Sequence, residues 1–303
     1  MAHETSAVQV QLRRGFQFEQ AGTTARALDV YRETLTITTT AEDEAEARLR
    51  IARVLRSLSE WDDAIAEARE ARRLAESVGA NDLAAEAINV EVGVHQFRGD
   101  FDTADRLIDR ALALSVSARV RGITLQNRGR GAAERRDFGT ADACFTESVQ
   151  AFREAGYELG MAIALTNLSA VARDKGDPAR GLEYAQEATS LCRRLNALDV
   201  LLVAVQNEAS ALVALNRLDE AERLLAEALG HFTSARNPVR QAECLEIMGQ
   251  MSEQRPDLET AARCYARALG IAQAAGDNPL IERMTKRLRS LEPSRDAQEI
   301  RGP

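Results

Sequence analysis

The stretch from Leu165 to Ala188, LTNLSAVARDKGDPARGLEYAQEA, decides the fold of this chain. It reads as one helix, a tight turn at Gly176-Asp177-Pro178 and a second helix. Asp177 is a typical N-terminal capping residue, and a proline is tolerated in the first helical turn. The same plan recurs along the whole sequence. The chain is therefore predicted to be all-α, an α-solenoid of helical hairpins that pack on their neighbours.

Four columns of residues recur in register through seven repeats, 37 to 40 residues apart. The anchor column, five residues after each turn, holds small residues: Ala27, Ala64, Ala104, Ala141, Gly181, Ala221 and Ala261. Twelve residues earlier stand Gly15, Ala52, Val92, Gly129, Ser169, Ala209 and Gly249. Four residues after each anchor stand Tyr31, Ala68, Ile108, Phe145, Ala185, Leu225 and Tyr265, and three further on Thr34, Ala71, Ala111, Ser148, Ala188, Ala228 and Ala268. Small residues that face each other let two antiparallel helices approach closely, and the larger residue fills the adjoining gap.

At these columns the chain resembles the tetratricopeptide repeat family. Trp61-Asp62-Asp63-Ala64 and Phe101-Asp102-Thr103-Ala104 match the family pattern where the turn enters the second helix. The resemblance covers roughly residues 8–276 and departs from the usual period of about 34 residues, so the helices are expected to be longer. It implies about seven antiparallel hairpins in a right-handed superhelix. Long-repeat members of the family recognise extended peptides or serve regulatory proteins.

Capping residues, prolines and glycines predict the boundaries of the helices. Hairpins are expected at 5–38, 41–78, 82–116, 118–155, 157–195, 198–235 and 238–275, so the repeat array occupies residues 1–278. Asn237 and Asn278 stand before prolines as capping residues, and Gly79, Gly156 and Gly276 stand where helices end. A capping helix is expected at 279–291 and a flexible tail at 292–303.

Composition disfavours several classes of function. The formal net charge of −8 argues against direct binding of nucleic acid, which needs a clustered positive surface. No apolar run could span a bilayer or act as a signal peptide, so a cytoplasmic protein without membrane contact is expected. The four cysteines and three histidines lack metal-ligand or catalytic spacing, and the cysteines are expected to be reduced and buried. We therefore expect no enzyme, no cofactor and no metal.

A ladder of carboxamides is the strongest functional signal. Asn127, Asn167 and Asn207 occupy one position of three consecutive first helices, two residues before the small packing residue, and Gln126 and Gln206 precede two of them. Asparagine is a poor helix former, so three in register suggest a selected role. The resemblance implies that first helices line a concave groove, where a carboxamide suits the main chain of a bound peptide. The alternative is that the ladder braces neighbouring helices, and both readings stay open.

Charge is uneven along the expected groove. The basic positions are Arg13, Arg50, Arg53 and Arg56 in the first two repeats and Arg130 and Arg173 in the middle, and the acidic positions are Glu243, Glu246 and Glu253 in the last. This pattern predicts a partner that is acidic near the N-terminal repeats, because complementary potentials set specificity. The alternative is an ordinary charged surface.

The sequence favours an adaptor that binds a protein or peptide in the groove. An alternative in the same binding class is the sensor module of a bacterial transcription or signalling system. An enzyme is less favoured, and self-association through an exposed end of the array stays possible. The identity of the partner is not encoded in a recognisable motif.

Overall fold

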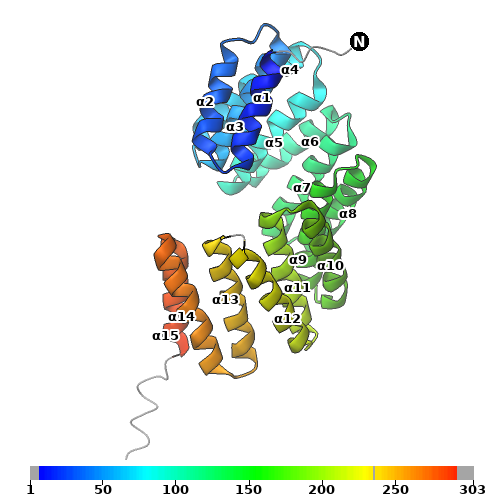
Figure 1. Cartoon of the computed structure of the whole chain (residues 1–303). Helices are drawn as coiled ribbons and strands as arrows, with labels where there is room; N and C mark the ends of the chain where they lie inside the picture. The colour runs from blue at the N-terminus through cyan, green and yellow to red at the C-terminus, as the bar shows by residue number, and fades with distance from the viewer. Residues whose placement is uncertain (1–6, 235, 292–303) are drawn as a thin grey trace, which may run out of the picture. The chain divides into compact units, whose positions relative to one another are not determined.

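The computed structural model describes residues 7–234 and 236–291, and every regular element in these ranges is a helix (Figure 1). The chain divides into two compact units, Met1–Ala164 and Leu165–Pro303, which are described separately. The boundary lies within α9. The expected tail, 292–303, lies outside the described residues.

Fifteen helices are described, and fourteen of them pair as hairpins. In the first unit these are α1 (Ala7–Gln20) with α2 (Thr24–Leu35), α3 (Ala41–Ser57) with α4 (Trp61–Ser77), α5 (Asn81–Phe97) with α6 (Phe101–Leu114), and α7 (Ala118–Glu134) with α8 (Phe138–Glu154). Then follow α9 (Glu158–Asp174) with α10 (Pro178–Leu195), α11 (Leu198–Ala214) with α12 (Leu218–Ser234), α13 (Pro238–Gln254) with α14 (Leu258–Ala275), and the single α15 (Asn278–Leu291). The predicted all-α solenoid of hairpins is confirmed, with boundaries within a few residues of those expected.

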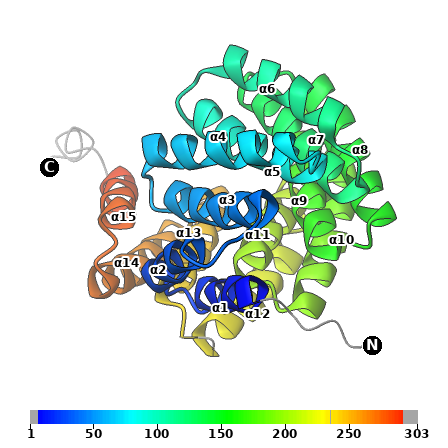
Figure 2. The same ribbon diagram turned by 90° about the horizontal axis from the view of Figure 1, so that it is seen from above.

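The first helices of neighbouring hairpins form a layer of their own within each unit. α3 contacts α5 and α5 contacts α7 in the first unit, and α11 contacts α13 in the second. Figure 2 shows α3 beside α5 in this layer. We call the surface of the odd-numbered helices that faces away from their hairpin partners the inner face. It is the surface on which the carboxamide ladder was expected to lie.

The predicted packing columns are the core of each hairpin. All seven anchor residues are buried, and in the column that follows them the seven side chains, from Tyr31 to Tyr265, are at most 2% exposed. In four hairpins a small residue of the first-helix column has a larger counterpart in this column, sixteen positions further on. A Cβ built on Gly15, Gly129 or Gly249 would overlap the ring of Tyr31, Phe145 or Tyr265 respectively, whereas Ala209 stands opposite the smaller Leu225. Volume is not conserved across every pair, because Ala52 and Ala68, like Ser169 and Ala185, are both small, whereas Val92 and Ile108 are both large.

Ser169 and Gly181 show the close approach that the small columns permit. The Ser169 hydroxyl donates to the Gly181 carbonyl oxygen at 2.7 Å, and a Cβ on Gly181 would lie 3.1 Å from the backbone oxygen of Ser169. A side chain at Gly181 would press on the backbone of α9, so the glycine favours this close approach of the two helices.

Helix ends follow the expected chemistry with one exception. The Asp177 and Asn237 side chains accept from backbone N–H groups in the first turns of α10 and α13, as predicted. The prediction that Asn278 caps the last helix is wrong. Asp277 accepts from the Leu280 N–H at 3.1 Å, which places Asn278 inside the helix. A carboxylate at Asp277 reaches the third residue of the helix, the geometry of a capping side chain.

The last helix covers the apolar end of the second unit. Leu280 is 2% exposed and Met284 fully buried, and both pack in a cluster that includes Tyr265 and Ala268 of α14. The four cysteines are free and buried, as predicted. Burial raises the pKa of Cys192 to about 11 and that of Cys244 to about 12, so both thiols stay protonated at neutral pH.

The described ranges contain neither a membrane-spanning helix nor a cluster of metal-binding side chains. Across residues 7–234 and 236–291, no helix has both the length and the apolar content needed to cross a membrane. The same ranges hold no group of three or more His, Cys, Asp or Glu side chains that could bind a metal ion.

Candidate functional site

The first member of the carboxamide ladder braces two helices of the inner layer. Asn127 of α7 is buried, and its Nδ2 donates to Oδ1 of Asn89 on α5 at 2.8 Å. Asn89 in turn donates to the Thr124 hydroxyl at 2.8 Å, and Gln96 donates to the backbone oxygen of Asn127 at 2.8 Å. These bonds tie α5 to α7 and leave little of the Asn127 amide for a ligand.

The other two members differ from the first in their exposure. Asn207 is half-buried, and its Nδ2 donates to the backbone oxygen of Thr166 at 2.8 Å, which joins α11 to α9. Asn167 is also half-buried, but within the described ranges its side chain makes no hydrogen bond. Gln126 has a buried Nε2 without a partner there, and Gln206 is half-buried. Asn127 and Asn207 therefore form hydrogen bonds between neighbouring helices. The amide N–H and C=O groups of Asn167 stay available.

The second unit has a pocket of about 320 Å³ on its inner face. Three consecutive first helices line it: α9 through Arg173, α11 through Ala209, Ser210, Val213 and Ala214, and α13 through Ile247, Gln250, Met251 and Gln254. Ser210 contributes a small side chain to this lining. Arg173 is half-buried and pairs with the adjacent Asp174, with Nη2 and Oδ1 3.3 Å apart.

The first unit has an inner pocket of about 370 Å³, which we call the Arg56 pocket. It is lined by Arg56, Trp61, Gly93, Gln96, Phe97, Arg130 and Glu134. Arg130, a predicted site residue, donates from Nη2 to Gln96 Oε1 at 2.8 Å and to Asn127 Oδ1 at 3.0 Å. The aromatic wall of this pocket was missed at the sequence level, although Trp61 is the only tryptophan of the chain.

Three of the six predicted basic positions, Arg50, Arg53 and Arg173, have acidic partners. Arg53 pairs with Glu86 of the next repeat, and Arg50 pairs with Glu46, with Nη2 and Oε1 3.3 Å apart. Arg13 is exposed on α1. The charge of Arg50 and Arg53 is thus largely compensated within the protein.

The acidic positions of the last repeat are compensated in the same way. Glu246 is 8% exposed and pairs with Arg283 of α15 at 2.9 Å, and Glu243 pairs with Arg240 at 2.9 Å. Glu253 accepts from the Tyr265 hydroxyl at 2.9 Å. Each of the three predicted acidic positions thus has a partner within the protein.

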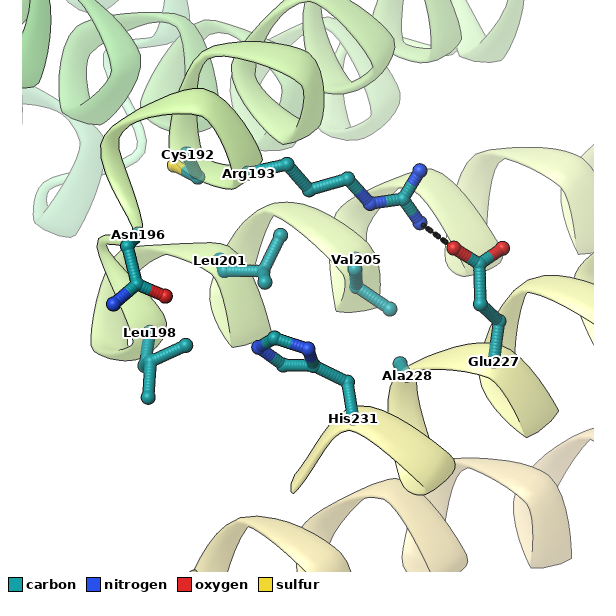
Figure 3. Close-up of a pocket in the computed structure, with 9 residues that line it drawn as sticks. All are labelled: Cys192, Arg193, Asn196, Leu198, Leu201, Val205, Glu227, Ala228 and His231. Carbon is teal, nitrogen blue, oxygen red and sulfur yellow. Dashed lines mark ion pairs between the residues drawn. The ribbon is translucent and has the colours of Figure 1, made fainter. Parts of the chain in front are cut away.

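A third pocket, of about 250 Å³, lies among α10, α11 and α12. Figure 3 shows Arg193 reaching toward Glu227 at one side of this pocket, with 3.0 Å between Nη2 and Oε1, and His231 near Leu201 and Val205. No sequence signal pointed to it.

Comparison with solved structures shows the tetratricopeptide-type fold that the sequence predicted. A STAND signal-transduction ATPase with a tetratricopeptide repeat sensor from Pyrococcus horikoshii is 15% identical with a TM-score of 0.72, covering 94% of this chain and 43% of that chain. The apo quorum sensor NprR from B. thuringiensis is 14% identical with a TM-score of 0.67, covering 87% and 76%. A Rap protein complexed with Competence and Sporulation Factor is 15% identical with a TM-score of 0.66, covering 89% and 76%.

These identities show a shared fold alone. The chain spans less than half the length of the STAND protein. No protein-family model matches the chain, and no curated protein gives a significant match.

Proposed function

We propose that the chain is a binding adaptor that holds a peptide segment of a partner protein against its inner helix faces. The observation that carries the proposal is the inner pocket of the second unit. It combines a floor of small residues, Ala209 and Ser210, with polar ends at Arg173, Gln250 and Gln254.

The chemistry of this pocket suits an extended peptide. Carboxamides offer a donor and an acceptor together, which matches the alternating N–H and C=O groups of a peptide main chain. The apolar side chains of Val213, Ile247 and Met251 can receive a ligand side chain, and methionine adapts to irregular shapes. Asn167, whose amide stays available, is the ladder member that we assign to ligand contact.

The experiment fills the pocket and compares the effect with the same bulk placed elsewhere. Peptides are first selected from a random library on the immobilised full chain, and the affinity of the selected peptides is then measured by calorimetry. Ser210→Phe should weaken them at least about tenfold, because the ring occupies the space that the ligand needs. Ala226→Phe, on an exposed position of α12, should leave the affinity unchanged.

Two results would contradict the proposal. One is a selection that yields no peptide above background. The other is equal affinity of the selected peptides for the Ser210→Phe variant and the original chain, which would place their site elsewhere.

A sensor role in a bacterial transcription or signalling system is the second candidate. It is favoured by the similarity in fold to the quorum sensor NprR and to the sensor-bearing STAND protein. In that case the peptide would change the affinity of the chain for an effector protein. Chemical cross-linking in the native cell, with and without a selected peptide, distinguishes a sensor from a static adaptor. Cytoplasmic location, the absence of enzymatic activity and self-association stay predictions.

A further inference from the structure

Arg56 on α3 is a charged side chain in the first unit that no partner compensates. Its residue is half-buried, and no hydrogen bond or ion pair engages its guanidinium within the ranges the structure describes. A Cβ built on Gly93 of α5 would lie 2.6 Å from Nη1 of Arg56, so the guanidinium occupies space that a side chain on α5 would take. Gly93 therefore allows the charge to lie deep in the Arg56 pocket.

The surroundings of Arg56 make this charge costly. Burial, together with the positive charges of Arg130 and Arg53, lowers the pKa of Arg56 to about 10. Partial burial also lowers the pKa of Arg130, against the opposing pull of Glu134. An arginine stays protonated at neutral pH, so the lowered pKa reports a cation that lacks a counter-ion.

Other half-buried arginines of the same unit show what a structural role looks like here. Arg48 pairs with Glu67 at 2.8 Å, Arg72 with the buried Glu91 at 2.6 Å, and Arg53 with Glu86. Each joins neighbouring helices through a carboxylate. Arg56 makes no such connection, although an uncompensated buried charge is unfavourable for folding.

The rest of the lining indicates what kind of counter-ion Arg56 would accept. Trp61 and Phe97 stack with their ring centroids 4.4 Å apart and an interplanar angle of 26°, and Phe97 is 71% exposed. This pair offers an aromatic platform beside Arg56. The two guanidiniums of Arg56 and Arg130 and the carboxylate of Glu134 leave one net positive charge in the lining. A single carboxylate balances it, whereas a phosphate dianion would leave an excess negative charge.

We propose that the Arg56 pocket binds the side-chain carboxylate of an aspartate or glutamate in a peptide, with an adjacent aromatic residue of that peptide stacked on Phe97. The inference rests on the proposed peptide-binding function and names one determinant of specificity. It also gives the predicted preference for an acidic partner a definite place in the second to fourth repeats.

Trp61 supplies the readout, because it is the only tryptophan in the chain and lies in the pocket. The probes are acetyl-Phe-Glu-amide, its neutral match acetyl-Phe-Gln-amide and acetyl-Phe-phosphoserine-amide, each titrated into the full chain while tryptophan fluorescence is recorded. The glutamate probe should bind at least about tenfold more tightly than the glutamine probe, the difference expected for a charge-assisted hydrogen bond.

Two variants test the assignment of Arg56 and one controls for the loss of a charge. Arg56→Gln should reduce affinity for the glutamate probe about tenfold or more without lowering the urea midpoint, because it removes an uncompensated charge. Glu134→Gln should increase affinity for the same probe, because it leaves a second net positive charge. Arg110→Gln, on the outer helix α6, removes an exposed partner of Glu76 and should change neither affinity.

Three results would overturn the proposal. The first is equal affinity for the glutamate and glutamine probes, or no fluorescence change at millimolar concentrations of either. The second is unchanged affinity of Arg56→Gln. The third is a phosphoserine probe that binds more tightly than the glutamate probe, which would assign the pocket to a phosphoryl group. In each case the Ser210→Phe comparison on library peptides is independent, so the adaptor proposal can stand while this one fails.

Discussion

The substitution Gly129→Ala tests the packing that defines the repeat. Gly129 on α7 faces Phe145 on α8, and a Cβ built there would lie 2.8 Å from Cδ1 of the ring. Ordinary contact of a Cβ begins at 3.4 Å, so the ring or the helix must move by roughly 0.6 Å. Phe145 is 2% exposed, so its ring is enclosed by other parts of the protein.

Two opposing effects set the size of the change. Overpacking of this kind costs about 1–3 kcal/mol, while alanine in place of glycine favours a helix by about 1 kcal/mol. Gly129→Ala should therefore lower the free energy of unfolding by up to about 2 kcal/mol. Adding Phe145→Leu recreates the Ala209–Leu225 pair found in the sixth hairpin, and it should recover about 1–2 kcal/mol relative to the sum of the single changes.

The assay combines urea denaturation, followed by circular dichroism, with hydrogen exchange of residues 118–154, because a repeat array can unfold in steps. Gly270→Ala is the matched control, since a Cβ there meets nothing within 4 Å. It should stabilise by up to about 1 kcal/mol through helix propensity alone. If Gly129→Ala stabilised as much as this control, or if Phe145→Leu gave no coupling, the size matching between columns would be refuted.

Three further predictions concern two connections between repeats and one turn within a hairpin. Burial alone would raise the pKa of Asp82, but hydrogen bonds from Ser117 outweigh it and lower the pKa. Asp82→Ala should therefore lower the free energy of unfolding by about 1–3 kcal/mol at neutral pH. The difference from the original chain should shrink as the pH falls through the lowered pKa, because the stabilisation is lost when the carboxylate becomes protonated. A difference that is independent of pH would contradict this. Asn127→Ala should cost about 1–3 kcal/mol in urea denaturation, since it leaves the buried Asn89 oxygen without its donor, and an unchanged midpoint would exclude bracing. Ser59 has a φ of 64°, so Ser59→Gly should raise the free energy of unfolding by up to about 1 kcal/mol in the same assay.

The fold was predictable because its determinants are close in sequence and repeated. Gly129 and Phe145 are sixteen positions apart, within one hairpin, and the same spacing joins Gly15 to Tyr31. Residues of each column are buried where two helices of one hairpin pack, so the constraint recurs at a fixed spacing that a single sequence displays seven times. Some turns were harder to predict from sequence. Arg136 takes a left-handed φ of 62°, where a glycine would be the usual sequence signal.

The candidate sites were only partly predictable. The sequence placed Arg173 along the expected groove, and the structure places it in the lining of an inner pocket. The sequence did not reveal that the Asn127 amide donates to Asn89, or that Arg53 forms an ion pair with Glu86. Those partners stand 38 and 33 residues away, in a neighbouring repeat, and local periodicity does not report them.

The sequence by itself thus determined the architecture. Small residues at a fixed spacing let two helices pack closely as an antiparallel hairpin, and this packing buries the apolar side of each helix. Only the tertiary structure decided which polar groups on those hairpins are already used. Arg50, Arg53 and Arg56 follow one another along the same helix and look equivalent in sequence. The packing of adjacent helices gives the first two a carboxylate and leaves Arg56 beside Gly93 without one in the described residues, because the electrostatic environment of a side chain is set by its neighbours in space.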